Sequence, residues 1–129
     1  MIRSNAFNYI NVLDKAADAS WVRNEVLANN IANATTPNFK RSDVNFESIL
    51  MKELQGSGSF NKRIANVDLK ELTPIIYKEN SNLQYRSDGN NVDIDMESAR
   101  LADNQIRYNA IVDSINQEFS RLRTVLTGL

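Results

Sequence analysis

The chain lacks cysteine and histidine altogether, although it is 129 residues long. Without thiolates and imidazoles it has neither the common ligands of a zinc site nor the base of a histidine-dependent catalytic triad. The absence of cysteine is compatible with passage through an oxidising compartment, although many cytosolic proteins of this size also lack it. Glycine and proline number only 4 and 2, which excludes a collagen-like chain. Any enzymatic proposal therefore depends on carboxylates, lysines and hydroxyls.

Long hydrophobic runs and an excess of either charge are missing as well. Fifteen basic residues against sixteen acidic residues leave a net charge of -1, so no overall field attracts phosphate backbones or anionic lipid. Nucleic acid is therefore not an expected partner. No segment is long and apolar enough to span a bilayer, and the first ten residues contain no run of signal-peptide length. If the protein leaves the cytoplasm, we expect export without a cleaved signal peptide.

Two long helices are predicted, one at each end of the chain. From Ala6 to Ile31, apolar and small residues recur at alternating spacings of three and four, which is typical of a packing seam. From about Asp95 to Leu126, apolar residues of a second stripe recur at spacings of seven, three or four residues. Asp93 or Asp95 is placed to cap the first turn of this helix. We expect an assembly interface to follow these two seams, at Ile10, Leu13, Ala17, Leu27, Ile31, Leu101, Tyr108, Ile111, Ile115, Phe119, Leu122 and Leu126.

The segment between the helices reads as irregular, with a little β structure. Thr36-Pro37 ends the first helix, because proline restricts the residue before it and cannot donate a backbone hydrogen bond. Four apolar residues at helical spacing predict a short helix, residues 55–59 read as a flexible linker, and residues 73–78 and 83–86 have the composition of strands. The helix residues are Phe46, Ile49, Leu50 and Leu54. We therefore expect a single domain of three parts, residues 1–36, 37–92 and 93–129.

Charged clusters in the sequence have ordinary structural interpretations. Asp88, Asp93, Asp95 and Glu97 resemble a calcium loop only in composition, because Val92 and Ala99 stand where oxygen ligands belong. A turn at Asp88-Gly89 followed by a helix cap explains the carboxylates better. The basic pairs lack interleaved aromatics, so we expect them on a solvated surface instead of a nucleic-acid patch. They are Lys40-Arg41, Lys62-Arg63 and Arg121 with Arg123. No metal, cofactor or small-molecule substrate is expected.

An asparagine-rich segment at the end of the first helix carries the most specific signal. Asparagines before a proline stop are sufficient to end a helix locally. The string itself, however, resembles the signature of the flagellar rod and hook protein family, at Asn29, Asn30, Ile31, Ala32, Asn33, Thr36, Pro37 and Phe39. A second stretch narrows the resemblance to the proximal rod proteins of that family, at Asp88, Gly89, Asn91, Val92 and Asp93, followed by residues 101–108.

The resemblance implies a non-enzymatic structural subunit of the flagellar basal body. Members of the family pair their terminal helices as an antiparallel, coiled-coil-like domain, which makes the expected fold mainly α with a short irregular and β middle. It implies export by the flagellar type III apparatus and polymerisation at the proximal end of the rod, across the cell envelope. The implied partners are further copies, other rod proteins, the adaptor protein that joins the rod to the membrane ring, and the export gate.

Two other function classes compete with this interpretation. A soluble helical adaptor or export chaperone that binds a partner helix would explain both apolar stripes, although not the asparagine signature. A carboxylate-dependent hydrolase built on residues 88–97 is the third class and has the least support. The export motif of early rod proteins, a phenylalanine followed four positions later by an aliphatic residue, is not matched, because Asn11 follows Phe7 at that distance. Tyr9 followed by Leu13 is the nearest substitute.

Overall fold

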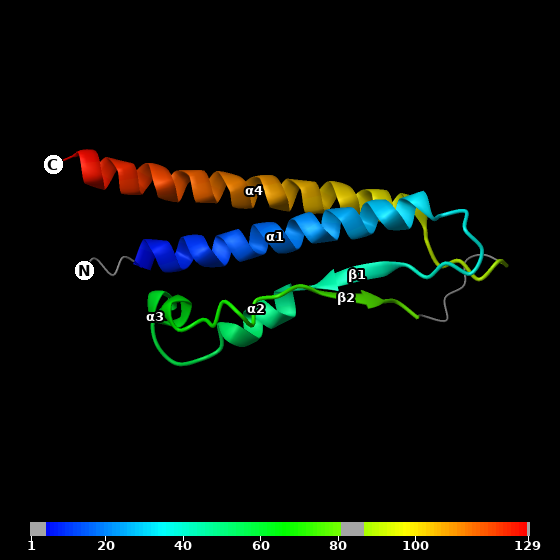
Figure 1. Cartoon of the computed structure of the whole chain (residues 1–129), viewed down its shortest axis with the longest axis horizontal. Coiled ribbons are helices and arrows are strands. Elements are labelled where there is room, and N and C mark those ends of the chain that lie inside the picture. The colour runs from blue at the N-terminus through cyan, green and yellow to red at the C-terminus, as the bar shows by residue number, and fades with distance from the viewer. Residues whose placement is uncertain (1–4, 81–86, 129) are drawn as a thin grey trace.

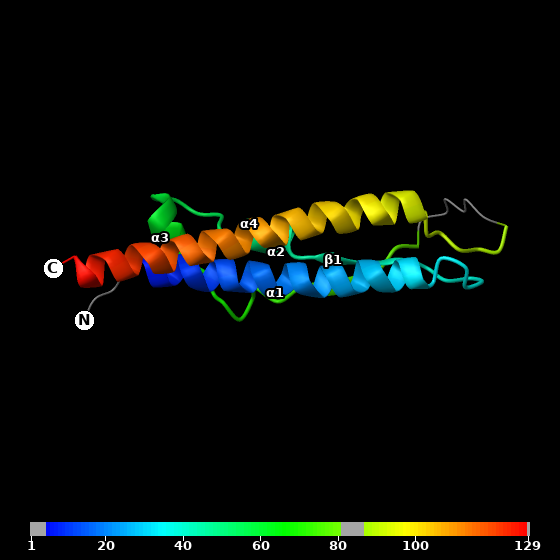
Figure 2. The same ribbon diagram turned by 90° about the horizontal axis from the view of Figure 1, so that it is seen from above.

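A computed structural model of the chain describes residues 5–80 and 87–128. Two long helices, α1 (Asn5–Ala32) and α4 (Ile94–Thr127), lie side by side and antiparallel, so that the start of α1 and the end of α4 lie at the same end of the molecule (Figure 1). The start of α1 and both ends of α4 fall within a residue or two of the predicted positions. Helix α1 ends at Ala32, before the predicted stop at Thr36-Pro37, because a turn held by bonds such as that from the N–H of Thr36 to the carbonyl of Asn33 follows it. The last turns of α4 project past the start of α1, which is visible in Figures 1 and 2. Among the described residues, no helix combines the length and hydrophobicity that crossing a membrane requires.

The start of α4 is capped as its sequence predicts. Asp93 has an extended backbone, and its carboxylate accepts hydrogen bonds from the backbone N–H of Asp95 at 3.0 Å and of Met96 at 3.3 Å. These bonds satisfy donors that have no partner inside the helix, and the negative charge faces the positive end of the helix dipole. The prediction of a cap at this position is confirmed.

The middle of the chain forms a layer that packs against α1 and lies below it in Figure 1, and Glu47 of this layer also pairs with Arg107 of α4. It contains α2 (Glu47–Glu53), α3 (Phe60–Ala65) and a two-stranded antiparallel sheet of β1 (Ser42–Asn45) and β2 (Ile75–Lys78). Ser42 pairs with Lys78, and Asn45 pairs with Ile75. The predicted short helix and the strand within residues 73–78 are confirmed. The strand predicted at residues 83–86 lies outside the described residues, and α3 and β1 were not predicted.

The main hydrophobic cluster lies between α1 and this middle layer. It is built from Val12 and Ala19 of α1 with Phe46, Ile64 and Leu72, and Leu72 is only 1% exposed. Ile49, Leu50 and Leu54 pack against it, as expected of the apolar face of α2. The predicted seam is therefore one of two packing faces of α1. Helix α1 becomes the central element, because it packs against both α4 and the middle layer.

Candidate functional site

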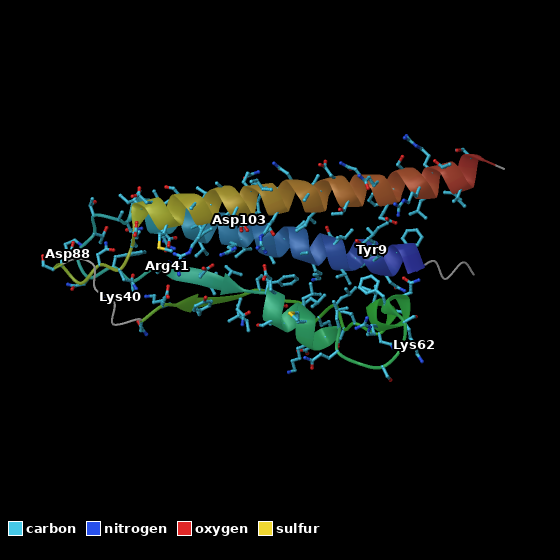
Figure 3. All side chains as sticks on the ribbon, turned by 180° about the vertical axis from the view of Figure 1, so that it is seen from behind. Tyr9, Lys40, Arg41, Lys62, Asp88 and Asp103 are labelled. Carbon is cyan, nitrogen blue, oxygen red and sulfur yellow. The ribbon has the colours of Figure 1, made fainter. Side chains whose placement is uncertain are left out.

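The two segments that carry the family resemblance meet at the end of the helix pair opposite the termini. Figure 3 shows Lys40, Arg41 and Asp88 at this end, with Arg41 lying beside the helix pair. Side chains of these segments, of the residues beside the two strands and of the first turn of α4 bond to one another here, and most of them are buried. We call this group the polar clasp, and it consists of Asn30, Arg41, Asp43, Glu79, Asn90, Asn91 and Glu97.

Asn30, in the last turns of α1, is completely buried and uses both ends of its amide. Its Nδ2 donates to the carbonyl of Ser42 at 2.7 Å and to Oε2 of Glu97 at 3.0 Å, while its Oδ1 accepts from the backbone N–H of Ser42 at 3.0 Å. A buried amide is tolerated only when it is bonded in this way. One side chain therefore links α1 to β1 and to α4.

Asn90 closes the turn that follows α1, and it is completely buried as well. Its Nδ2 lies 3.0, 3.1 and 2.9 Å from the carbonyls of Asn33, Ala34 and Thr36, and its Oδ1 accepts from the backbone N–H of Val92 at 2.8 Å. An amide has two N–H groups, so the three carbonyls share them. Asn90 thus supplies donors to carbonyls of the turn that follows α1, where the helical hydrogen-bond pattern has ended. Asn90 is not among the residues predicted from the sequence.

Its neighbour Asn91 holds the two strands in place at their ends. The Oδ1 of Asn91 accepts from the backbone N–H of Arg41 at 2.7 Å, and its Nδ2 donates to the carbonyl of Glu79 at 2.8 Å. Arg41 precedes β1 and Glu79 follows β2, so this amide bridges the open end of the sheet. The only sequence signal for both roles is the repeat of asparagine beside the turn at Asp88-Gly89.

Gly89 itself brings the two segments close together. Its φ is 78°, and a Cβ at this position would stand 2.7 Å from Oδ1 of Asn38. Asn38 also has a positive φ, of 61°, and its N–H donates to the carbonyl of Asp88 at 2.9 Å. Glycine and asparagine are the residues that adopt this conformation at least cost. The predicted turn at Asp88-Gly89 is confirmed, and it lies against the chain that leaves α1.

Arg41 is the charged centre of the clasp and is only 5% exposed. Its Nε donates to Oε1 of the buried Glu97 at 2.5 Å, and its Nη2 donates to Asp43 at 3.0 Å. Its Nη1 pairs with Glu79. Two further guanidinium groups complete the network, because Arg100 pairs with Glu97 at 2.6 Å and Arg23 pairs with Asp43 at 2.9 Å. Three guanidinium groups thus face three carboxylates, and their formal charges balance.

The surroundings of this network shift the pKa values of its members in consistent directions. Burial alone would raise the pKa of Asp43, but hydrogen bonds from Arg23, from the backbone N–H of Val44 and from Arg41 lower it overall. Burial would likewise lower the pKa of Arg41, and its hydrogen bonds to Glu97, Glu79 and Asp43 raise it instead. Both groups are therefore held in their charged forms, which is the condition for a buried ion pair to be stable.

One expectation about these charges was wrong. The pair Lys40-Arg41 was expected on a solvated surface, but Arg41 is buried and the half-buried Lys40 donates to the carbonyl of Gly89. The partner that justifies burial, Glu97, lies 56 residues away in the chain, so no local pattern reveals it. The acidic residues also divide their roles: Asp93 caps a helix, Asp95 is exposed and Glu97 belongs to the clasp.

A cleft of about 620 Å³ lies between α1, α4 and the segment from β1 to α2. Its charged lining residues bind one another: Arg23 pairs with Asp43, and Arg107 pairs with Asp103 and with Glu47 across the opening. Figure 3 shows Asp103 on α4. These carboxylates are paired with guanidinium groups of the same chain. We therefore interpret the cleft as a structural contact between the layers and not as a binding site.

The predicted seam residues divide between buried and open positions. Ile10 and Leu27 are buried, and a larger group is half-buried, namely Leu13, Ala17, Ile31, Leu101, Tyr108, Ile111, Ile115 and Leu122. The rings of Trp21 and Tyr108 lie 5.9 Å apart, and the buried Asn104 donates to the carbonyl of Ser20 at 2.8 Å. Phe119 and Leu126, in contrast, are 51% and 71% exposed. Most of the seam therefore joins α1 to α4 within one subunit, while its last part is open.

Comparison with known proteins places this arrangement among flagellar proteins. Residues 10–40 match the family model described as flagella basal body rod protein. The chain is 37% identical over 118 residues to the flagellar basal body rod protein FlgB of Bacillus subtilis (strain 168), covering 90% of this chain and 91% of that protein. It is 35% identical to the protein of the same name from Borrelia hermsii, covering 91% and 94%. The identity to that of Escherichia coli (strain K12) is 33%, covering 81% and 82%.

Proposed function

The chain belongs to the FlgB family of flagellar basal body rod proteins, and from this premise we propose that it polymerises through its terminal helices at the proximal end of the rod. Its place is the basal body rod, and it is a structural protein, not an enzyme. We further propose that the flagellar type III apparatus exports it without a cleaved signal peptide. The terminal helices provide the contacts, and the polar clasp holds them in one arrangement.

The open surface of α4 is the observation that carries the assembly proposal. Of the described residues in this 34-residue helix, only Glu97 and Asn104 are buried. Large apolar side chains along it remain exposed, at Ile106, Phe119, Val125 and Leu126, with exposed fractions of 51–71%. Burying apolar surface stabilises by roughly 25 cal/mol per Å², so a neighbouring helix on this face adds a substantial contact.

Polymerisation follows if each subunit uses two different faces, one to bind the subunit before it and the other to bind the subunit after it. Contacts between two unlike faces repeat from subunit to subunit and build an open helical structure instead of a closed dimer. The elongated helix pair supports this proposal, because a long side offers room for several neighbours (Figure 2). The adaptor or chaperone alternative has no specific observation in its favour.

The remaining partners are proposed from family membership. They are other rod proteins, the adaptor protein that joins the rod to the membrane ring, and the export gate, which would read the N-terminal region around Phe7, Tyr9 and Leu13. Phe7 is exposed on the folded subunit, whereas Tyr9 and Leu13 are half-buried, so an unfolded chain presents the latter two better. We propose that residues 1–129 act as one rod-subunit domain, because α1 packs on both α4 and the middle layer.

Carboxylate substitutions on α4 test the assembly proposal in cells. Phe119→Asp changes an exposed side chain, so we expect a folded, exported subunit that fails to form rods and leaves cells non-motile. Ile115→Asp places a charge in the half-buried seam within the subunit, and we expect it to lower the stability of the subunit itself. Met51→Asp places the same charge at an exposed apolar residue of α2 and serves as the matched control. Normal rods and swimming with Phe119→Asp would contradict the role of this face.

A further inference from the structure

The solvent face of α1 carries charge of one sign. Its exposed residues recur at spacings of three and four and form a single stripe, which we call the acidic stripe: Phe7, Asn11, Asp14, Asp18, Trp21, Glu25 and Ala28. The charged residues in it are all carboxylates, and none of them makes an ion pair within the part of the chain that the structure describes. Trp21 stands among them 54% exposed, between Asp18 and Glu25. The indole contacts Tyr108 of α4 within the subunit, and the rest of it is open to solvent. The face therefore combines unneutralised negative charge with a half-exposed indole.

The last turns of α4 carry the opposite combination. Phe119, Arg123 and Leu126 fall on one stripe at spacings of four and three, and all three are exposed. We call these residues the cationic tip. Arg121 pairs with Glu118, whereas Arg123 has no ion pair within the described residues. The tip lies in the last turns of α4, and the end of this helix projects past the start of α1 (Figures 1 and 2). A projecting end is accessible to another molecule from several sides.

The two stripes match in length, and the base of one falls where the other has an aromatic side chain between two acids. Asp18, Trp21 and Glu25 span two helical turns as acid, aromatic and acid, and the cationic tip spans two turns as apolar, base and apolar. If the two stripes were laid together, the guanidinium of Arg123 would stand over the exposed part of the Trp21 indole, between the carboxylates of Asp18 and Glu25. Arginine is attracted to the face of tryptophan, and the flanking carboxylates add charge pairing. Phe119 and Leu126 then cover the sides of the indole.

We infer that the cationic tip of one copy docks on the acidic stripe of a second copy of this chain. The two surfaces are different, so the contact is heterologous and repeats from copy to copy. The inference rests on the proposed polymerisation and names the faces that meet in it. Within one copy the two stripes are offset along the helix pair, because α1 and α4 run antiparallel, Trp21 lies beside Tyr108, and Arg123 is fifteen residues further along α4. A second copy is therefore needed to bring them together.

Charge reversal in the purified full-length chain tests the contact. We expect concentration-dependent self-association in sedimentation velocity, and Arg123→Glu should weaken it by about tenfold or more, since a carboxylate placed against the carboxylates of the acidic stripe is repelled. Adding Asp18→Arg and Glu25→Arg to the same chain should restore association. Lys52→Glu reverses an exposed charge on α2 with the same change in net charge and should have little effect. A chain that stays monomeric at hundreds of micromolar, an equal effect of Lys52→Glu, or no restoration by the double reversal overturns the inference.

Cross-linking provides a second readout that is independent of affinity. The chain has no cysteine, so two introduced thiols are the only ones present. Mixing the Asp18→Cys chain with the Arg123→Cys chain under mild oxidation should produce mixed disulfide dimers. Asp18→Cys mixed with Asp113→Cys, an exposed position on a different face of α4, should not. Equal yields from the two mixtures overturn the inference. Rods that form normally in cells while both tests fail would show that the chain polymerises through other faces, which leaves the proposed function intact.

Discussion

Asn30 and Glu97 lie 67 residues apart in the chain, yet Nδ2 of Asn30 donates a hydrogen bond to Oε2 of Glu97 across 3.0 Å. Both side chains are completely buried. The bond joins the end of α1 to the first turn of α4, and Arg41 reaches the other carboxylate oxygen of Glu97 from beside β1. The family-like segments thus contribute to one buried polar network. This network fixes the position of the end of α1 relative to the start of α4 and to β1.

Removing the charge of Glu97 should therefore destabilise the subunit strongly. Glu97→Gln leaves Arg41 and Arg100 without a shared carboxylate in a buried site, and breaking a buried pair costs about 3–5 kcal/mol. Urea unfolding followed by circular dichroism measures the loss. Asp95→Asn, two residues away and exposed, is the control and should change the free energy of unfolding by less than about 0.5 kcal/mol. A similar, small effect of both substitutions would show that the network adds little stability.

The pKa of Asp43 predicts a pH dependence. Because hydrogen bonds lower its folded-state pKa below the usual value, Asp43 contributes stability above that usual value, near pH 4, and loses the contribution as pH falls through the lowered pKa. Asp43→Asn should therefore be less stable than the parent at pH 7, and the difference should narrow as the pH falls below about 4. Unfolding titrations at several pH values measure it. A difference that stays constant down to pH 2 would contradict the assignment.

The stability of the subunit should depend on the side-chain amide nitrogen of Asn90. Asn90→Asp removes the donors that three carbonyls share and sets a carboxylate against them, so we expect a loss of at least about 2 kcal/mol. The same exchange at the exposed Asn116 of α4 should be nearly neutral. Thermal unfolding of the two variants decides between these outcomes. If the variants melt alike, the end of α1 does not depend on Asn90.

Substitutions of Asp93 test whether this position needs a hydrogen-bond acceptor for the helix cap or a negative charge. Asparagine caps a helix about as well as aspartate, so Asp93→Asn should be nearly neutral, whereas Asp93→Ala should cost about 1 kcal/mol by removing the acceptor of two N–H groups. Calcium or magnesium should leave the melting temperature of the parent chain unchanged. A clear rise of the melting temperature with either ion would reopen the interpretation of residues 88–97 as a ligand site.

The sequence by itself determined the features that depend on neighbouring residues. The periodicity of apolar residues predicted both long helices, because positions three and four apart share a helix face. The cap at Asp93, the turn at Gly89, the short helix near Phe46 and the strand around Ile76 also follow from local chemistry. The signature strings are local too, and they identified the family before any contact was known.

Only the tertiary structure decided what pairs across the chain. Arg41 looked like half of a solvated basic pair, since its buried partner Glu97 is 56 residues away. The second packing face of α1, through Val12 and Ala19, was hidden because small and β-branched residues between two stripes do not reveal what will cover them. Strand β1 has a sequence of weak β preference and exists because it pairs with β2 and lies against α1. In each case the stabilising partner is distant in sequence, and burial depends on that partner being in place.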